Sequence, residues 1–242
     1  MSRNILITGV SQGLGLATAR AVVNAGWTVY GVSRRRSDEF AALASSNPGR
    51  VHFYPFDLGN VEGVRTEVFG KFVPLTIPLH GFVNNAAVAY VDLVSNLNGE
   101  KLRAMYSVNV FAPMMIVKQA IRNGLFHRQP VAIVHVSSIS AHTGYKGLAM
   151  YASTKGALEA FSRNTAREWG ARGIRSNAVV AGFMETGMSE GLTEERRQRI
   201  FRRTSLNAAT QPASVAQTVV FLLSDGAASI TGQNIFVDSG TI

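Results

Sequence analysis

Short apolar runs alternate with longer amphipathic stretches along the chain, and this alternation limits most strongly what the chain can fold into. Strands separated by helices pair in parallel, so the pattern predicts a parallel sheet of about seven strands with helices on both faces. We expect strands at Asn4–Thr8, Thr28–Ser33, Val51–Pro55, Gly81–Asn84, Val131–Val136, Ser176–Val180 and Asn234–Val237. We expect helices at Leu14–Ala25, Val61–Phe69, Lys101–Arg122, Met150–Ala171 and Ser214–Leu223.

The composition indicates one α/β domain over residues 1–242. A chain of 242 residues with 46% hydrophobic content can bury one large core, and no linker or repeat divides it. The absence of cysteine excludes disulfides, thiolate nucleophiles and cysteine-bound metals. The five histidines are scattered, so we predict no metal site.

The apolar runs, the N-terminal residues and the net charge limit the expected cellular compartment and the expected binding partners. No apolar run reaches the roughly 20 residues of a membrane helix, and no signal peptide precedes the first strand, so we expect a cytoplasmic protein without a membrane partner. The net charge is +9. Such a charge favours acidic partners, although it also serves solubility alone. No nucleic-acid-binding motif accompanies it, so we expect no nucleic-acid partner.

Small or polar residues follow six of the predicted strands almost immediately. Ligands of a parallel sheet bind beyond the carboxyl ends of its strands, where the strand order reverses. We therefore expect these residues to lie along one binding edge of the sheet. Their shared position after the strands is stronger evidence for a ligand site than any one of them alone. The six are Gly9, Ser33, Asp57, Asn85, Ser138 and Gly182.

The first strand ends in a glycine turn that leads into a helix. Glycine lets the backbone approach a pyrophosphate closely, and the new helix offers free N–H groups and its positive end. Glycines often serve only to turn a strand into a helix, but the position after the first strand favours a dinucleotide site in a doubly wound, Rossmann-type sheet. We expect the cofactor phosphates to contact Gly9, Ser11, Gln12, Gly13, Leu14 and Gly15.

The end of the second strand indicates which dinucleotide binds. A site for NAD places an acid about 20 residues after the glycines, to hold the ribose 2′-hydroxyl. Here Ser33 and Arg34 take that place, and the first acid is Asp38. Arg34 can bind the 2′-phosphate of NADP with two N–H groups, and Ser33 can donate a hydrogen bond to it. We therefore predict NADP(H), the alternative being a solvated basic turn.

Tyr151 and Lys155 lie four positions apart in a predicted helix and so share one face. A free tyrosine has a pKa of about 10, and a nearby ammonium stabilises the phenolate, so we expect Lys155 to lower the pKa of Tyr151. Ser138 ends the fifth strand, where it can hydrogen-bond a substrate oxygen. The spacing alone also occurs in surface pairs, but together with Ser138 and the glycine turn it predicts proton transfer.

With these motifs the sequence resembles the short-chain dehydrogenase/reductase family over essentially its whole length. The matching motifs are the glycine turn, the pair after strand three, the asparagine pair after strand four, a helix asparagine and the active-site triplet. They fall at Thr8–Gly15, Asp57-Leu58, Asn84-Asn85-Ala86, Asn109, and Ser138, Tyr151 and Lys155. Ala87 and Ala181 depart from the family's usual glycine and proline.

The resemblance implies a role for each matching residue in reducing a carbonyl. Tyr151 would protonate the developing alkoxide, Ser138 would orient the carbonyl, and Lys155 would also hold the nicotinamide ribose. Asn109 would anchor a water that connects Lys155 to solvent. Further cofactor contacts are implied for Asp57 and Leu58 at the adenine, Asn84 and Ala86 at the ribose, and Gly182 and Thr186 at the carboxamide.

Within the family the sequence is most similar to the 3-oxoacyl-[acyl-carrier-protein] reductases. The resemblance implies a 3-oxoacyl thioester substrate and docking of an acidic carrier protein by Arg128 and Arg172 near the mouth of the site. Residues 183–206 would form a flap over the substrate. The alternatives are a reductase of a small alcohol, sugar or other ketone, and a non-catalytic NADP-binding regulator. The resemblance also implies a homotetramer.

Overall fold

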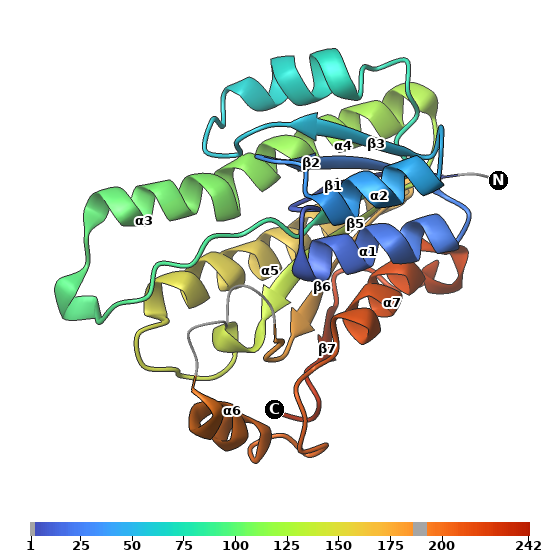
Figure 1. The fold of residues 1–242 in the computed structure, drawn as a ribbon. Helices are drawn as coiled ribbons and strands as arrows, with labels where there is room; N and C mark the ends of the chain where they lie inside the picture. The colour runs from blue at the N-terminus through green and yellow to red at the C-terminus, as the bar shows by residue number, and fades with distance from the viewer. Residues whose placement is uncertain (1–2, 186–192) are drawn as a thin grey trace.

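Seven strands form one parallel sheet in the order β3-β2-β1-β4-β5-β6-β7 (Figure 1). This computed structural model describes residues 3–185 and 193–242. Because β2 and β4 flank β1, the strand order reverses beside β1, where crossovers leave for opposite sides. The strands are β1 Asn4–Thr8, β2 Thr28–Ser33, β3 Val51–Pro55, β4 Gly81–Asn84, β5 Val131–Ser138, β6 Ile174–Ala181 and β7 Asn234–Val237.

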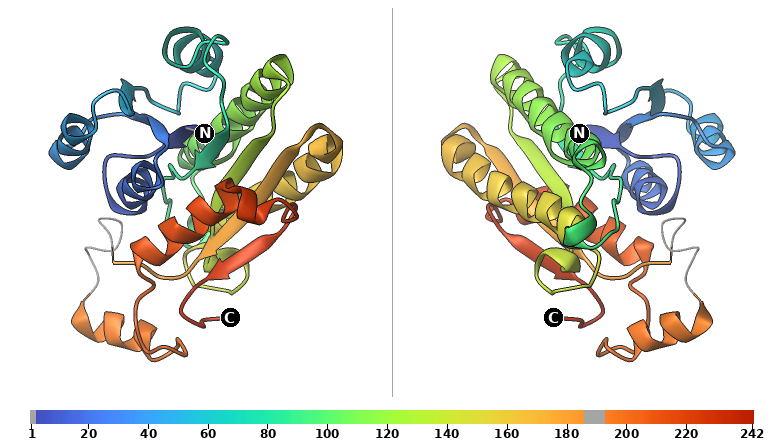
Figure 2. Two further views of the ribbon diagram at one scale, coloured as in Figure 1. Left: turned by 90° about the vertical axis from the view of Figure 1, so that its right-hand side faces the viewer. Right: turned by 90° about the vertical axis from the view of Figure 1, so that its left-hand side faces the viewer.

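Helices cover both faces of the sheet, because its central strands are apolar on both sides (Figure 2). One core cluster joins the sheet to α1, α2 and α7, and the other joins it to η1 and α4. The helices are α1 Gly13–Asn24, α2 Asp38–Ser46, α3 Gly99–Tyr106, α4 Ala112–His127, α5 Ala149–Trp169, α6 Glu194–Phe201 and α7 Pro212–Leu223, with π-helical segments η1 Val64–Phe72 and η3 Ser107–Phe111. Within the described ranges, no helix is long and apolar enough to cross a membrane.

The predicted parallel sheet is confirmed, whereas one helix was missed and two helical predictions, Val61–Phe69 and Lys101–Arg122, need correction. The helix α2 was not predicted, although Ser37 before it accepts a hydrogen bond from the Phe40 N–H (3.2 Å) and two acids fill its first turn. The segment η1 begins three residues later than the predicted helix at Val61–Phe69. Both segments are short, at nine residues each, and a prediction that relies on long apolar periodicity misses or misplaces such segments.

The predicted helix Lys101–Arg122 is three segments, α3, η3 and α4, and Pro113 gives the reason. Proline has no N–H, so Pro113 cannot donate to the carbonyl of Asn109, four residues earlier. The helix widens just before it, and the Ala112 N–H bonds to the Ser107 carbonyl five residues back. The carbonyl of Asn109 thereby loses its regular helical partner beside the predicted site.

Candidate functional site

The predicted site residues meet at the carboxyl edge of the sheet. Thr8 pairs with Val32, so the glycine turn begins beside the end of β2. At the other side Ser138 pairs with Ala181, which places the end of β5 beside the loop that starts at Gly182. The edge therefore runs from Ser33 past the reversal at β1 and β4 to Gly182, as the sequence predicted.

The glycine turn has the backbone that only glycine adopts easily. Gly9 and Gly13 have φ values of +75° and +54°, in the left-handed region. A Cβ on Gly15 would lie 1.9 Å from the carbonyl oxygen of Gly9, so no side chain fits there. The side chain of Gln12 does not cap α1, and no acid lies in its first turn. The first N–H groups of α1 are thus left for an anion, which fits a pyrophosphate.

Asn85 clamps the glycine turn, a role that the sequence did not reveal. Its side-chain amide donates to the carbonyls of Thr8 (3.0 Å) and Gly9 (3.1 Å). In return the Thr8 hydroxyl oxygen accepts from the N–H groups of Asn85 and Ala86, both at 3.2 Å. The side chain of Asn84, predicted at the ribose, is instead buried, with its amide 3.3 Å from Nδ1 of His135. The signal for Asn85 was its place directly after β4.

The end of β2 fits a phosphate group. The hydroxyl oxygen of Ser33 is buried and has no hydrogen-bond partner among the described residues. Arg34, Arg35 and Arg36 are exposed, and none of them forms an ion pair within residues 3–185 and 193–242. An orphaned hydroxyl beside unpaired guanidinium groups is the set of donors that a 2′-phosphate requires. These residues fit NADP(H), as predicted.

The remaining predicted cofactor residues lie along the same edge. Asp57 is exposed after β3, and its carboxylate accepts from the Gly59 N–H (2.9 Å), whereas Leu58 is buried. The Gly182 N–H bonds to the Val237 carbonyl (2.9 Å), which fixes the start of the loop after β6. Thr186 lies outside the described residues. No group of three metal-ligating side chains was found in the described ranges.

Tyr151 and Lys155 lie together in the first turns of α5, as their spacing predicted. The Lys155 side chain is 2% exposed, and its ammonium lies 5.5 Å from the centre of the Tyr151 ring. The ammonium donates to the Val136 carbonyl at 2.8 Å, so one of its three N–H bonds is used by β5. The other two, and the Tyr151 hydroxyl, have no hydrogen-bond partner in the described part of the chain and face no competitor for a ligand.

The predicted direction of the Tyr151 pKa shift is wrong for the chain without its ligands. Burial raises the pKa of Tyr151 to about 12, because a phenolate loses its hydration there. The ammonium of Lys155 lies 5.5 Å from the ring centre and does not offset this cost. Burial also lowers the pKa of Lys155 to about 8. The resting site therefore holds a protonated phenol, which is the form that donates a proton.

Ser138 and Asn109 complete the candidate catalytic group. The Ser138 hydroxyl oxygen accepts from the Ser140 N–H (3.2 Å) and hydroxyl (3.0 Å), so its own proton remains free to bind a substrate oxygen. The Asn109 side chain accepts from the Val88 N–H and donates to the Val88 carbonyl, both at 2.9 Å. It also donates to the Thr154 hydroxyl (3.1 Å), next to Lys155. Asn109 thus joins the segment after β4 to α5.

Arg128 and Arg172 are not where the resemblance implied. Both are exposed, but Arg128 precedes β5 and Arg172 precedes β6. The site lies at the opposite ends of these strands, about 23 Å away along the eight residues of β5. Within one chain they cannot line the mouth of the site, and only a second copy of the chain can bring them to it.

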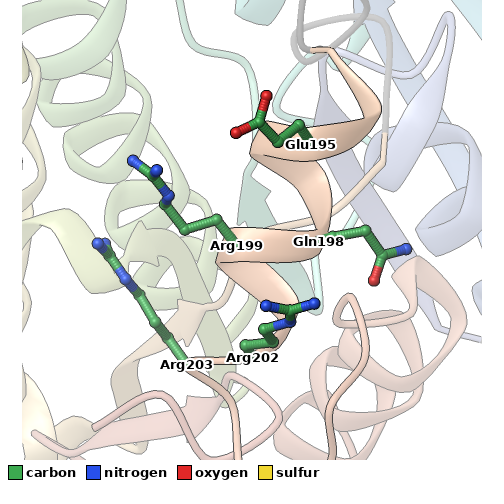
Figure 3. A pocket seen from close by; sticks show the side chains of 5 residues that line it. All are labelled: Glu195, Gln198, Arg199, Arg202 and Arg203. Atoms are coloured by element: carbon green, nitrogen blue, oxygen red, sulfur yellow. The ribbon is translucent and has the colours of Figure 1, made fainter.

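The helix α6 lies in the predicted flap, of which the structure describes residues 183–185 and 193–206. The Phe201 ring packs 6.3 Å from the ring of Phe183, which directly follows Gly182, and so α6 is tied to the site edge. One face of α6, continued by the two residues that follow the helix, lines a hollow of about 350 Å³ (Figure 3). This basic face consists of Glu195, Gln198, Arg199, Arg202 and Arg203. None of its arginines forms an ion pair with another described residue.

Comparison with known proteins identifies relatives along the whole chain. A family model described as enoyl-(acyl carrier protein) reductase matches residues 9–241. The chain is 31% identical over 239 residues to a 3-oxoacyl-[acyl-carrier-protein] reductase of Thermotoga maritima, covering 98% of this chain and 96% of the relative. It is 32% identical over 237 residues to carbonyl reductase [NADPH] 2 of Sus scrofa, covering 97% and 94%.

A solved structure extends the comparison to three dimensions. A variant of actinorhodin polyketide ketoreductase with NADPH superposes with a TM-score of 0.90 at 26% identity. The match covers 99% of this chain and 97% of that one. The site edge described above therefore belongs to a sheet shared over essentially its full length.

Proposed function

The chain belongs to the short-chain dehydrogenase/reductase family, and from this premise we propose that it reduces 3-oxoacyl thioesters on acyl carrier protein with NADPH. That it is an oxidoreductase acting on carbonyl or alcohol groups follows from the family itself. The observation that carries the proposed chemistry, carbonyl reduction, is the protonated Tyr151 hydroxyl, with no protein partner in the described part of the chain, beside the buried Lys155 ammonium.

The residues of the chain bind and orient the carbonyl and deliver a proton to it. The bound cofactor supplies the hydride. Ser138 donates its free hydroxyl proton in a hydrogen bond to the carbonyl oxygen, which fixes the carbonyl over the site. Tyr151 then gives its proton to the same oxygen as negative charge develops on it. The two unused N–H bonds of Lys155 would hold the ribose hydroxyls of the cofactor, and its charge would stabilise the phenolate that remains after proton transfer.

The preference for NADPH rests on Ser33 and Arg34. A charge-assisted hydrogen bond contributes about 1.5–3 kcal/mol, which is about 10- to 100-fold in affinity. We expect Arg34→Ala to raise the KM for NADPH by such a factor and to leave the KM for NADH nearly unchanged. Steady-state kinetics with both cofactors measures this, and an equal loss for both would contradict the role of Arg34.

The basic face of α6 supports an acidic, carrier-bound substrate. Arg199, Arg202 and Arg203 gather within two helical turns, and Figure 3 shows Arg199 and Arg203 extending from the same side of α6. Like charges four residues apart repel each other by about 0.2–0.5 kcal/mol, a cost that an anionic partner removes. Arg128 and Arg172 lie at the far edge, whereas the basic face of α6 is tied to the site edge through Phe201 and Phe183.

A second candidate is the reduction of small carbonyl compounds or sugars. The identity to carbonyl reductase [NADPH] 2 of Sus scrofa matches that to the carrier-protein reductase within one per cent, and an L-xylulose reductase of Caenorhabditis elegans is 28% identical over 240 residues. Fold and catalytic residues do not separate these substrates, so the test is substrate choice.

The test compares three kinds of carbonyl substrate. NADPH oxidation is measured with acetoacetyl groups on acyl carrier protein, with the matching free thioester, and with simple ketones and sugars. We expect the highest kcat/KM on the carrier. We expect the double substitution Arg199→Glu and Arg203→Glu to raise the KM for the carrier-bound substrate alone. A preference of the unaltered enzyme for simple ketones would establish the second candidate instead.

A further inference from the structure

A buried carboxylate lies one helical turn beyond Lys155, and none of the steps above uses it. Glu159 is 6% exposed on the inner side of α5. Helix residues four positions apart lie on the same face, so Glu159 and Lys155 point toward the same side of α5. A buried charge is costly unless it is paired and hydrogen-bonded, so the partners of Glu159 indicate its purpose.

Three side chains from three different segments bind Glu159. The Ser137 hydroxyl donates to Oε1 from β5, and the His142 ring lies 3.0 Å from the same oxygen. The Asn234 amide donates to Oε2 from β7 at 2.7 Å, and Nε2 of His142 is 2.9 Å from that oxygen too. Both carboxylate oxygens are thus engaged.

Two of these partners enclose Ser138 in the sequence. Ser137 directly precedes Ser138, and His142 follows it by four residues, after the short helical turn Ile139–Ala141. The strand end that presents the Ser138 hydroxyl is therefore tied on both sides to one carboxylate. Because Glu159 belongs to the same helix as Tyr151, these bonds also fix Ser138 relative to Tyr151.

The charge of Glu159 acts on Lys155 as well. Burial lowers the pKa of Lys155 to about 8, and the negative charge of Glu159 opposes that lowering. The other ionisable groups near Lys155 give no such support. Burial lowers the pKa of His135 on β5 to about 3, so it is neutral, and Tyr151 is neutral as well. His142 is the ionisable side chain that contacts the Glu159 carboxylate directly.

We propose that Glu159 is a positioning residue for the reaction, which holds both sides of Ser138 and supplies the negative charge that faces the buried Lys155 ammonium. It does not contact substrate. The inference rests on the proposed carbonyl reduction but not on the identity of the carbonyl compound. A purely structural carboxylate would lower activity equally at every pH, whereas this one raises the pH at which the buried Lys155 loses its proton.

The first test is the pH profile of kcat/KM, measured with any carbonyl substrate that the unaltered enzyme reduces. Glu159→Gln keeps the shape of the side chain and removes the charge. We expect its alkaline limb to move down by about one pH unit, the low end of the effect of a nearby opposite charge. Glu159→Asp keeps the charge but shortens the side chain by one methylene group. Its alkaline limb should therefore lie between that of the unaltered enzyme and that of Glu159→Gln. Asn234→Ala removes a donor but no charge and should leave the limb in place.

The second test needs no turnover. The lysine side chains of the ligand-free protein are labelled with ¹³C and titrated by NMR, with Lys155→Met to identify the Lys155 signal. We expect the titration midpoint of Lys155 to lie at a lower pH in Glu159→Gln than in the unaltered protein, and to be lowered less in Glu159→Asp. The test therefore remains possible if only one of the two variants folds. An unmoved midpoint and limb in the folded variants would overturn the proposal. Absence of any reduction by the unaltered enzyme would instead refute the proposed function, and the NMR result would still decide the role of Glu159.

Discussion

Tyr151 is the residue on which the proposed chemistry depends most directly. Its hydroxyl is the proton donor, and general acid catalysis of this kind contributes about 10²- to 10⁴-fold. We expect Tyr151→Phe to lower kcat by such a factor while NADPH binding, followed by fluorescence titration, changes little. Tyr106→Phe is the control, because that hydroxyl bonds to Ser153 on the outer side of α5. Retained turnover in Tyr151→Phe would refute the assignment.

Lys155 predicts a pH dependence with a definite sign. Burial lowers its pKa to about 8, so the ammonium is present below that pH and is lost as the pH rises through it. The contribution of the ammonium to the rate should therefore be complete well below pH 8 and decline above it. We expect kcat/KM to fall with an apparent pKa of about 8, measured with an unionisable ketone at saturating NADPH. A profile that stays flat far into the alkaline range contradicts this prediction.

At the scale of elements, the join between β1 and α1 tolerates no side chain at Gly15. A Cβ there would meet the Gly9 carbonyl at 1.9 Å, so the turn must shift in Gly15→Ala. We expect loss of NADPH binding and a free energy of unfolding lower by about 1–3 kcal/mol, the usual cost of overpacking. The control is Gly156→Ala in α5, where a Cβ would meet nothing within 4 Å and helix propensity favours alanine by about 1 kcal/mol. Fluorescence titration and urea unfolding measure both effects, and unimpaired binding in Gly15→Ala would contradict the steric argument.

The elements that were predicted correctly owe this to local patterns. The strands and the glycine turn follow from apolar runs and their terminators, and Tyr151 with Lys155 follows from helical spacing. The clamp joins Asn85 to Thr8, 77 positions away, and the bond from Asn234 reaches Glu159 across 75 positions. No local pattern carries such contacts. The direction of the Tyr151 pKa was missed for the same reason, because burial depends on the whole fold.

At the scale of the whole molecule, large apolar side chains on α7 and β7 are exposed to solvent. Phe221 on α7 is 46% exposed and Phe236 on β7 is 42% exposed, and β7 is an edge strand. Unpaired edges and exposed aromatic residues are typical of surfaces that bind another copy. The family resemblance implies two interfaces, one between the long helices that hold Asn109 and Tyr151 and one formed by the last strand and the helix Ser214–Leu223. The exposed residues of α7 and β7 coincide with the second.

We predict a homotetramer of about 104 kDa, four times the 26.0 kDa of one chain, by light scattering. Phe221→Glu should split it into dimers, because the new charge would be buried without a partner. The matched control is Leu75→Glu, since Leu75 is also 46% exposed but precedes β4 and so lies on neither α7 nor β7. A monomeric unaltered protein would contradict the assembly, and with it any docking role for Arg128 and Arg172.

The strand order also has a consequence for synthesis on the ribosome. After β1, β2 and β3 are added in turn on one side, and β4, β5, β6 and β7 are then added in turn on the other. Each new strand therefore joins an existing border, and none has to be inserted between two strands that have already paired. A nascent chain can extend its sheet in the order in which it is translated, and the half that holds the glycine turn can take shape before the half that holds Tyr151 has been made.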